Sequence, residues 1–417
     1  MMPEPDCSIV SIVSGVFAVN NPIFPVTKYL EILILITALL SAALLLSACS
    51  NSEAAAPQPA PAVTEVPAEF ADAAEPDPPV EIDGVLFCAD TPRLVLSGLD
   101  VSKDEIEEIL PQFPQLSILD LRGTSITRDD ALSICARYPS ITVLWDVSLF
   151  GSLYPSDTVE LDLSGTAMKD SSELEEVLCC FPKLEKVILS DCGLSDEYMD
   201  ALNRRYDDIS FVWTVHFSVY SLRTDATVFC ASDVPKLGNV APELTSPELD
   251  PIKYCTELEA LDLGHMNFKD IDFLKNMTKM KYLILVQGKF KDIGVIANMP
   301  DLEYLELFNN NRIVDLTPLL NCRKLKHLNI GYCYYAQWET LKEMPWLERL
   351  WMPHVEISEE ELAGLQKVLP DTLIYAPHDD PMGSTGGGWR EDQSYYDMRD
   401  IMGMPYLPGG TGMGLGW

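Results

Sequence analysis

Hydrophobic positions recur with a fixed period between residues 258 and 357. The pattern L-x-x-L-x-L places its middle leucine at Leu261, Leu283, Leu305, Leu328 and Leu350, in steps of 22, 22, 23 and 22 residues. The alternation of apolar and other residues predicts a short strand in each unit, and the apolar segment after the strand predicts a return along the other side of a core. One such unit cannot bury both of its faces, so neighbouring units must stack.

These five copies resemble the bacterial leucine-rich repeat, in particular the internalin type. The match extends to a D-[IL]-x-x-[LIF] segment after each of the first three strands, at Asp270, Asp292 and Asp315. The resemblance implies an α/β leucine-rich-repeat solenoid, with a curved parallel β-sheet on the concave face and helices and irregular segments on the convex face. The position of the family's asparagine ladder is occupied here by Met266, Gly288, Asn310, Cys333 and Val355. Only one copy keeps asparagine, so the turns must satisfy their backbone in other ways.

Residues 84–221 form a second repeat of longer period. The segment 90–98 recurs as 157–165, and 141–147 recurs as 209–215, so the offset is 67 to 68 residues. A tandem duplication accounts for both matches. Each copy is predicted to contain two strands joined by amphipathic helices.

Amphipathic helices are predicted over 103–110 and 171–179, where the apolar spacing is helical. Each copy then ends on a strand that contains a tryptophan, Trp145 or Trp213. Recurrence at the same register favours a packing role for these rings over ligand stacking. Residues 222–257 break both patterns and are predicted to bridge the two blocks.

The residues that flank the repeat leucines face away from the core, because side chains alternate across a strand. They are rich in aromatic rings mixed with polar groups, the composition of interface hot spots. The candidate ligand-binding residues are Tyr282, Tyr304, Glu306, Phe308, Asn309, His327, Asn329, Tyr332, Arg349, Trp351 and His354. A protein or peptide ligand is expected there, and a glycan is the alternative because sugars also stack on rings.

The C-terminal tail offers a different occupant for this face. Residues 384–417 begin with a glycine-rich run, read as a flexible bend, and continue with many apolar side chains, among them Trp389, Tyr395, Met398 and Met402. Such a segment must dock on something. A short helix is predicted over 393–402, and coverage of the face by this tail stays open beside ligand binding.

The N-terminal region has the order of a bacterial lipoprotein signal peptide. Lys28 precedes an apolar run that ends in Leu46-Ser47-Ala48-Cys49, so cleavage before an acylated Cys49 is expected. A transmembrane helix over 29–48 is the alternative, because that length spans a bilayer. The residues after Cys49 are rich in alanine, proline and acids and predict a disordered spacer. Translation starting near Val26 would explain the long extension before the basic residue.

Composition narrows the function further. The net charge is -35 and the isoelectric point is near 4.3, which opposes nucleic-acid binding because phosphate contacts need Lys and Arg. The eleven cysteines include no C-x-x-C pair, so a structural zinc has little support. Common catalytic motifs are missing from the sequence. We therefore expect no cofactor, no metal and no enzymatic activity.

The sequence thus predicts a lipid-anchored recognition protein outside the cytoplasm, with a structural envelope protein without ligand as a further alternative. The predicted segments are a signal peptide (1–48), a lipidated spacer (49–83), a duplicated block (84–221), a bridge (222–257), an internalin-like block (258–357), a C-terminal cap (358–383) and the tail (384–417).

Overall fold

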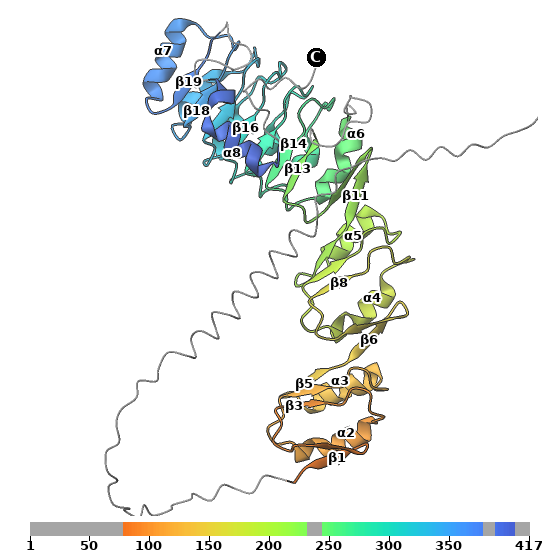
Figure 1. Cartoon of the computed structure of the whole chain (residues 1–417). Coiled ribbons are helices and arrows are strands. Elements are labelled where there is room, and N and C mark those ends of the chain that lie inside the picture. Colours follow the sequence, from red (N-terminus) through yellow and green to blue (C-terminus); the bar gives the residue numbers. More distant parts are fainter. Residues whose placement is uncertain (1–77, 232–243, 378–387, 405–417) are drawn as a thin grey trace, which may run out of the picture. The chain divides into compact units, whose positions relative to one another are not determined.

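The structure, a computed structural model, describes residues 78–231, 244–377 and 388–404. In these residues the strands form three parallel sheets and three antiparallel hairpins, with helices in the connections, so the fold is α/β (Figure 1). The predicted signal peptide, Cys49 and nearly all of the predicted spacer lie outside the described residues. Among the helices that are described, none has the length and apolar character needed to cross a bilayer.

The fold begins earlier than the predicted residue 84. Strand β1 (Val80–Ile82) pairs with β2 (Val85–Phe87) as an antiparallel hairpin. Val80 and Ile82 are buried while Glu81 between them is exposed, which is the alternation of a strand with one face on a core. The hairpin turn places both Asp83 and Gly84 at positive φ, as a tight two-residue hairpin loop requires.

Each copy of the duplication builds one parallel three-stranded sheet followed by a hairpin. The first copy contains β3 (Arg93–Val95), α2 (Lys103–Ile109), η1 (Leu110–Gln112), β4 (Ile118–Asp120), α3 (Arg128–Arg137), β5 (Thr142–Leu144), β6 (Asp146–Leu149) and β7 (Ser152–Pro155). The second contains β8 (Glu160–Asp162), α4 (Ser172–Val177), η2 (Leu178–Cys180), β9 (Lys186–Ile188), α5 (Asp196–Asn203), β10 (Ser210–Val212), β11 (Thr214–Phe217) and β12 (Tyr220–Arg223). The duplication read from the sequence is confirmed element by element.

The single tryptophan-containing strand predicted at the end of each copy is in fact two strands. Trp145 lies between β5, which pairs in parallel with β4, and β6, which pairs antiparallel with β7. At the tryptophan the backbone bonds to the residue after the hairpin: Trp145 N donates to Ser156 Oγ at 3.1 Å, and Trp213 N donates to Thr224 Oγ1 at 3.2 Å. The chain changes strand partner at this residue, which is a tertiary event that periodicity does not reveal.

The two predicted amphipathic helices are confirmed, with shorter ends. Helix α2 begins after Ser102, whose hydroxyl accepts from the Glu105 backbone while the Glu105 carboxylate accepts from the Ser102 backbone. This capping box satisfies amide groups that the first turn leaves without partners. Ile106 is the fully buried residue of α2, and Leu174 occupies the same place in α4.

The predicted bridge contains the first strand of the next sheet. Strand β13 (Val228–Cys230) pairs in parallel with β14, and Phe229 faces Leu261. Thr224-Asp225 stands before β13 as Ser156-Asp157 stands before β8. The long repeat therefore begins a third time after the hairpin β11–β12, with strand β13, and continues directly into the internalin-like block. Helix α6 (Ser246–Leu249) and the 3₁₀ helix η5 (Asp250–Tyr254) follow.

The internalin-like block and its cap share one seven-stranded parallel sheet in chain order. After β13 come β14 (Ala260–Asp262), β15 (Tyr282–Ile284), β16 (Tyr304–Glu306), β17 (His327–Asn329), β18 (Arg349–Trp351) and β19 (Leu373–Tyr375). The five repeat leucines pair in register across it, and each is fully buried. The region of the predicted cap holds α7 (Glu359–Val368) followed by strand β19, which pairs in parallel with β18.

Unit length decides what lies between the strands. Successive strands start 25 residues apart at β3 and β4 but 22 residues apart at β14 and β15. The shorter units connect their strands through 3₁₀ helices rather than α-helices. A 3₁₀ helix is tighter than an α-helix and occurs in short pieces, so it suits the short return path. These are η6 (Asp272–Leu274), η7 (Gly294–Asn298), η8 (Thr317–Asn321) and η9 (Trp338–Glu343).

The turn that follows each strand uses left-handed backbone. In the long units this position holds glycine at Gly98, Gly123 and Gly165, and Asp191 after β9. In the short units it holds residues with side chains, and their φ angles lie between 56° and 65°, at His265, Gln287, Asn309, Tyr332 and His354. Left-handed backbone is unfavourable by about 1 kcal/mol or more for each residue that carries a side chain. Contacts in the surrounding structure must therefore hold these residues in that conformation.

The asparagine-ladder position is satisfied by different chemistry in different repeats. Asn310 Nδ2 donates to the carbonyls of Leu285 and Leu307 at 2.7 and 2.9 Å. In the next repeat the thiol of Cys333 donates to Leu307 O at 3.2 Å, and Cys192 Sγ donates to Leu163 O at 3.1 Å in the long block. A buried thiol thus takes over part of the role of the amide.

Candidate functional site

The outer face of the seven-stranded sheet consists of the side chains that flank the repeat leucines, and all the candidate ligand-binding residues lie on it or in the turns beside it. Two rows cross the strands in register. Tyr282, Tyr304, His327 and Arg349 form one row, and Glu306, Asn329 and Trp351 form the other. The ring centroids of Tyr304 and His327 lie 5.9 Å apart, and those of His327 and Trp351 lie 6.3 Å apart. The face is therefore a continuous aromatic surface.

A C-terminal segment of the same chain covers this face. It consists of the 3₁₀ helix η10 (Trp389–Glu391) and helix α8 (Gln393–Ile401) (Figure 1). Its buried side chains, Trp389, Met398, Met402 and Met404, share one hydrophobic cluster with the outer face. That cluster is separate from the main core between the sheets and the connecting helices. The predicted helix over 393–402 is confirmed to within one residue.

Trp389 anchors the start of this segment. Its ring lies 5.0 Å from the ring of Phe308, and the ring of Phe308 lies 5.1 Å from that of Tyr332. The guanidinium carbon of Arg390 lies over the indole of Trp389, 4.5 Å from the ring centroid. Trp389 is 2% exposed, so nearly all of its apolar surface is removed from water by this contact.

An acidic residue at the start of α8 links the segment to the sheet. Asp392 accepts from Ser394 N at 3.0 Å as the helix N-cap. Its second carboxylate oxygen accepts from Arg349 Nε at 2.6 Å. Burial works against the charged carboxylate, but the hydrogen bonds from Ser394 and Arg349 hold the pKa of Asp392 below its usual value.

Glu306 is the buried ionisable group at the centre of the face. It is 5% exposed and accepts a hydrogen bond from Tyr304 Oη at 2.5 Å. Burial raises the pKa of Glu306 to about 7. Arg390 and Arg399 of the covering segment favour the carboxylate, while the charge of Asp262 opposes it. Burial also lowers the pKa of His327 in the neighbouring row.

The exposure expected of the candidate residues is not what the structure shows. Buried residues are Tyr304, Glu306, Phe308, Asn329 and Trp351, and half-buried residues are Tyr282, Asn309, His327, Tyr332, Arg349 and His354. They do gather on one face, but the chain's own C-terminal segment lies over it. The alternative that the tail covers this face thus describes the structure, while ligand binding by these residues stays a prediction.

Several residues of the covered face are not among the candidate ligand-binding residues. Asp392, Met398 and Met402 supply contacts from the tail, and Ile284 and Val286 supply contacts from the sheet. The signal for the tail residues was the density of apolar side chains in a segment too short to fold alone. That signal shows that the segment docks, but it does not say where.

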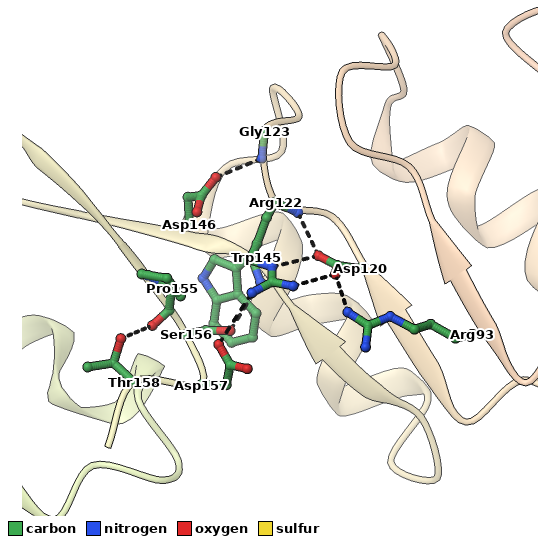
Figure 2. Close-up of polar contacts among 10 residues, drawn as sticks. All are labelled: Arg93, Asp120, Arg122, Gly123, Trp145, Asp146, Pro155, Ser156, Asp157 and Thr158. Atoms are coloured by element: carbon green, nitrogen blue, oxygen red, sulfur yellow. Dashed lines mark hydrogen bonds and ion pairs between the residues drawn. The ribbon is translucent and has the colours of Figure 1, made fainter. Parts of the chain in front are cut away.

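A second polar cluster lies at the other end of the described chain, on the first parallel sheet (Figure 2). Asp120 on β4 accepts from Arg93 Nη2 at 2.7 Å and from Arg122 Nε at 2.8 Å. The hydrogen bonds from Arg122, opposed by burial, lower the pKa of Asp120 to about 2. Arg122 also lies 3.7 Å from Asp157, which follows the hairpin β6–β7. The cluster is fully charge-paired and joins the first sheet to the start of the second.

The same joint recurs one repeat later. Asp225, at the position equivalent to Asp157, accepts from Lys186 Nζ at 3.2 Å and from Arg223 Nε at 2.5 Å. Only the acid of this joint recurs, since Ile188 and Ser190 stand at the places of Asp120 and Arg122. A charge-paired acid at the same joint in both copies favours a structural role. Among the described residues no group of three or more His, Cys, Asp or Glu side chains could hold a metal ion. No disulfide bond links any of the nine described cysteines.

Comparison with known proteins yields similar structures only. No family model matches the chain, and no curated protein matches it. Internalin C2 of Listeria monocytogenes is 16% identical, with a TM-score of 0.27, over 52% of this chain and 80% of that chain. A second internalin of that species is 18% identical, with a TM-score of 0.27, over 72% and 87%. A leucine-rich-repeat protein of Leptospira interrogans is 15% identical, with a TM-score of 0.27, over 66% and 75%.

Likenesses with so low a TM-score say nothing about ligand or mechanism. They concern leucine-rich-repeat proteins, the class that the in-register, buried leucines of β14 to β18 indicate independently.

Proposed function

We propose that this protein is a leucine-rich-repeat solenoid that recognises a protein or peptide partner noncovalently through the outer face of its seven-stranded sheet. In this proposal the face is the concave surface of the solenoid. The protein acts outside the cytoplasm on a lipid tether at Cys49, and it is not an enzyme. The tether places the recognition face at the cell surface, beyond the acidic and proline-rich spacer.

One observation carries the proposal: the outer face already binds a helical segment. Trp389 and three methionines of the tail pack on its aromatic surface, and Asp392 pairs with Arg349. Hot spots of protein interfaces combine such buried aromatic anchors with a paired arginine. A surface that holds one peptide segment through these contacts has the chemistry to hold another.

The test is capture of a partner by residues 78–417, which keep the β1–β2 hairpin that a start at 84 would cut. Envelope extracts and host secretions serve as sources, and any captured protein is then purified and titrated. We expect saturable binding that falls at least tenfold in Trp351→Ala, because that ring is a buried aromatic member of the covered cluster. Tyr335→Ala is the matched control, since Tyr335 is 63% exposed and lies outside the covered cluster.

Binding that is equal in Trp351→Ala and Tyr335→Ala would contradict the proposal, provided that both variants retain the native circular dichroism spectrum. Absence of any saturable partner, with a well-folded protein, would instead favour a structural role in the envelope.

A further inference from the structure

The contacts of the tail define the kind of peptide that the outer face accepts. Three features act together: an aromatic ring before the helix, an acid at the helix N-cap, and apolar side chains one helical turn apart. In the tail these are Trp389, Asp392, and the pair Met398 and Met402. Residues four apart lie on the same side of a helix, so both methionines meet the sheet. This arrangement is a helix laid on an apolar surface with fixed anchor positions.

Charge completes the match between helix and face. Arg349 on β18 holds the N-cap acid at 2.6 Å. Glu306 at the centre of the face is attracted by Arg390 and Arg399 of the covering segment. The face therefore selects for an acid at the start of the helix. A helix with the opposite arrangement would bring like charges together, which weakens binding.

The tail does not satisfy every group that it covers. Asn329 is fully buried on the outer face between Glu306 and Trp351. Its Oδ1 accepts from Gly331 N at 3.0 Å, but its Nδ2 has no hydrogen-bond acceptor among the described residues. A buried donor without an acceptor is unfavourable. An incoming peptide that offers an acceptor at this point would gain a contact that the tail lacks.

The covering segment also has the properties of one that can undock from the outer face. Helix α8 has nine residues, and a helix of this length is not stable alone in water. Its buried side chains belong to the cluster on the face and not to the main core. The folded repeats therefore keep their core when the segment undocks, and docking and helix formation are coupled.

On these grounds, and resting on the proposed function, we propose that the outer face is a receptor site for an external amphipathic helix with an aromatic anchor, an N-cap acid and apolar side chains one turn apart, and that the C-terminal segment is its built-in competitor. Because the segment is tethered, it competes at an effective concentration on the order of millimolar. An external helix binds when it matches the anchors better than the segment does or when the segment is displaced.

The experiment uses the full chain and a labelled synthetic peptide of residues 388–404 as the probe. The chain is opened by Trp389→Ala with Met398→Ser, changes that lie in the tail and leave the face intact. We expect the peptide to bind the opened chain at least tenfold more tightly than the wild-type chain, because the competitor no longer occupies the site. Fluorescence anisotropy measures the affinities, and circular dichroism confirms that each chain is folded.

A charge exchange tests the register. Adding Arg349→Glu to the opened chain is expected to lower peptide affinity at least tenfold, and a peptide carrying Asp392→Arg is expected to recover it. Tyr335→Ala in the opened chain is the matched control and leaves affinity unchanged. Rescue by the exchanged charge is a result that general damage to the face would not give.

Three outcomes would overturn the inference. They are no peptide binding by a folded opened chain, equal binding by wild-type and opened chains, and a wild-type dimer in sedimentation that the tail substitutions abolish. The last would make a second copy the occupant. Because the probe is a fixed peptide, failure here with successful partner capture rejects the helix inference alone. Peptide binding without any captured partner rejects the proposed function alone.

Discussion

Among single residues, Glu306 is a buried carboxyl group whose pKa is raised by the fold. Its carboxyl is buried under the tail beside Tyr304, and Asp262, Arg390 and Arg399 are the charged groups that act on it. Its pKa rises from 4.5 to about 7. The covered state therefore holds a proton on Glu306 more firmly than the open state does, and pH acts on the cover.

We predict that tail docking is strongest below about pH 4.5 and weakens as the pH rises towards 7, because the covered state binds more protons than the open state in that window. The upper limit of the change is about 3 kcal/mol, from a pKa difference of about 2.5 at 1.36 kcal/mol for each unit. Hydrogen exchange of the α8 amides, corrected for intrinsic rates at pH 5 and 7.5, measures it.

Glu306→Gln is the control for this prediction, since the amide keeps the size of the side chain and does not titrate. Its α8 protection should be nearly the same at the two pH values. Equal pH dependence in wild type and Glu306→Gln would show that another group controls docking.

A second residue-scale prediction uses the duplication as its own control. Trp213 Nε1 donates to Asp196 at 3.0 Å, whereas Trp145 Nε1 is buried without a partner among the described residues. The residue equivalent to Asp196 in the first copy is Arg128. A substitution that leaves a hydrogen-bonding group without its partner costs more stability than one that leaves none. Trp213→Phe leaves Asp196 without its donor, whereas Trp145→Phe removes an indole that has no acceptor among the described residues.

We therefore expect Trp213→Phe to lower the free energy of unfolding by about 1 to 2 kcal/mol more than Trp145→Phe does. Urea unfolding of the two variants measures the difference. Equal losses would mean that ring packing alone decides the cost. A larger loss in Trp145→Phe would contradict the assignment of the unpaired indole.

Among elements, the joints between repeats are where charge is used structurally. Asp120 on β4 is 3% exposed and holds Arg93 and Arg122, and Arg122 reaches on to Asp157 beyond the next hairpin (Figure 2). The alternation of the strands places these side chains, but their pairing depends on neighbouring strands in register. The cluster stabilises the connection between the first parallel sheet and the second.

Asp120→Ala is predicted to destabilise the protein by about 2 kcal/mol, because it removes the charge-assisted hydrogen bonds of the half-buried Arg122 and the exposed Arg93. Asp157→Ala, which removes only the 3.7 Å contact of a more exposed carboxylate, is expected to cost at most about 0.5 kcal/mol. Urea unfolding at pH 7 compares the two. Similar losses would contradict the central role of Asp120.

The pH dependence of this element has the opposite sign to that of Glu306. The pKa of Asp120 falls from 3.8 to about 2, so its stabilising contribution is complete above about pH 3.8 and is lost as the pH falls through 2. The two groups thus act in separate pH ranges and can be measured independently.

At the scale of the whole molecule, the N-terminal region bears on where the protein works. The described residues hold no helix that could cross a bilayer, and the apolar run before Cys49 lies outside them. The lipoprotein proposal rests on the order of the basic residue, the apolar run and the small residues before Cys49.

We predict that the full-length protein made in a bacterial host incorporates an alkyne fatty acid and partitions into detergent, and that Cys49→Ala does neither. In-gel fluorescence after click labelling reads the acylation, and mass spectrometry reads cleavage before residue 49. An unprocessed N-terminus in both proteins would favour the transmembrane alternative.

The sequence by itself determined the repeats. Leu261, Leu283 and the other repeat leucines fix the strand register, because only one alternation buries them all. The duplication fixed the copies in the same way, and Ser102 with Glu105 fixed the start of α2. These are local or periodic signals, and the chain carries them without reference to its fold.

Only the tertiary structure decided what lies on the outer face. The sequence shows Tyr304 and Trp351 as outward residues and shows an apolar tail, but it does not show that Trp389 meets Phe308 or that Asp392 meets Arg349. Those contacts join residues 43 or more positions apart, across a segment with no repeat pattern of its own. Periodicity reports which side of a strand a residue takes, whereas docking depends on the shape and charge of a surface that exists only after the strands assemble.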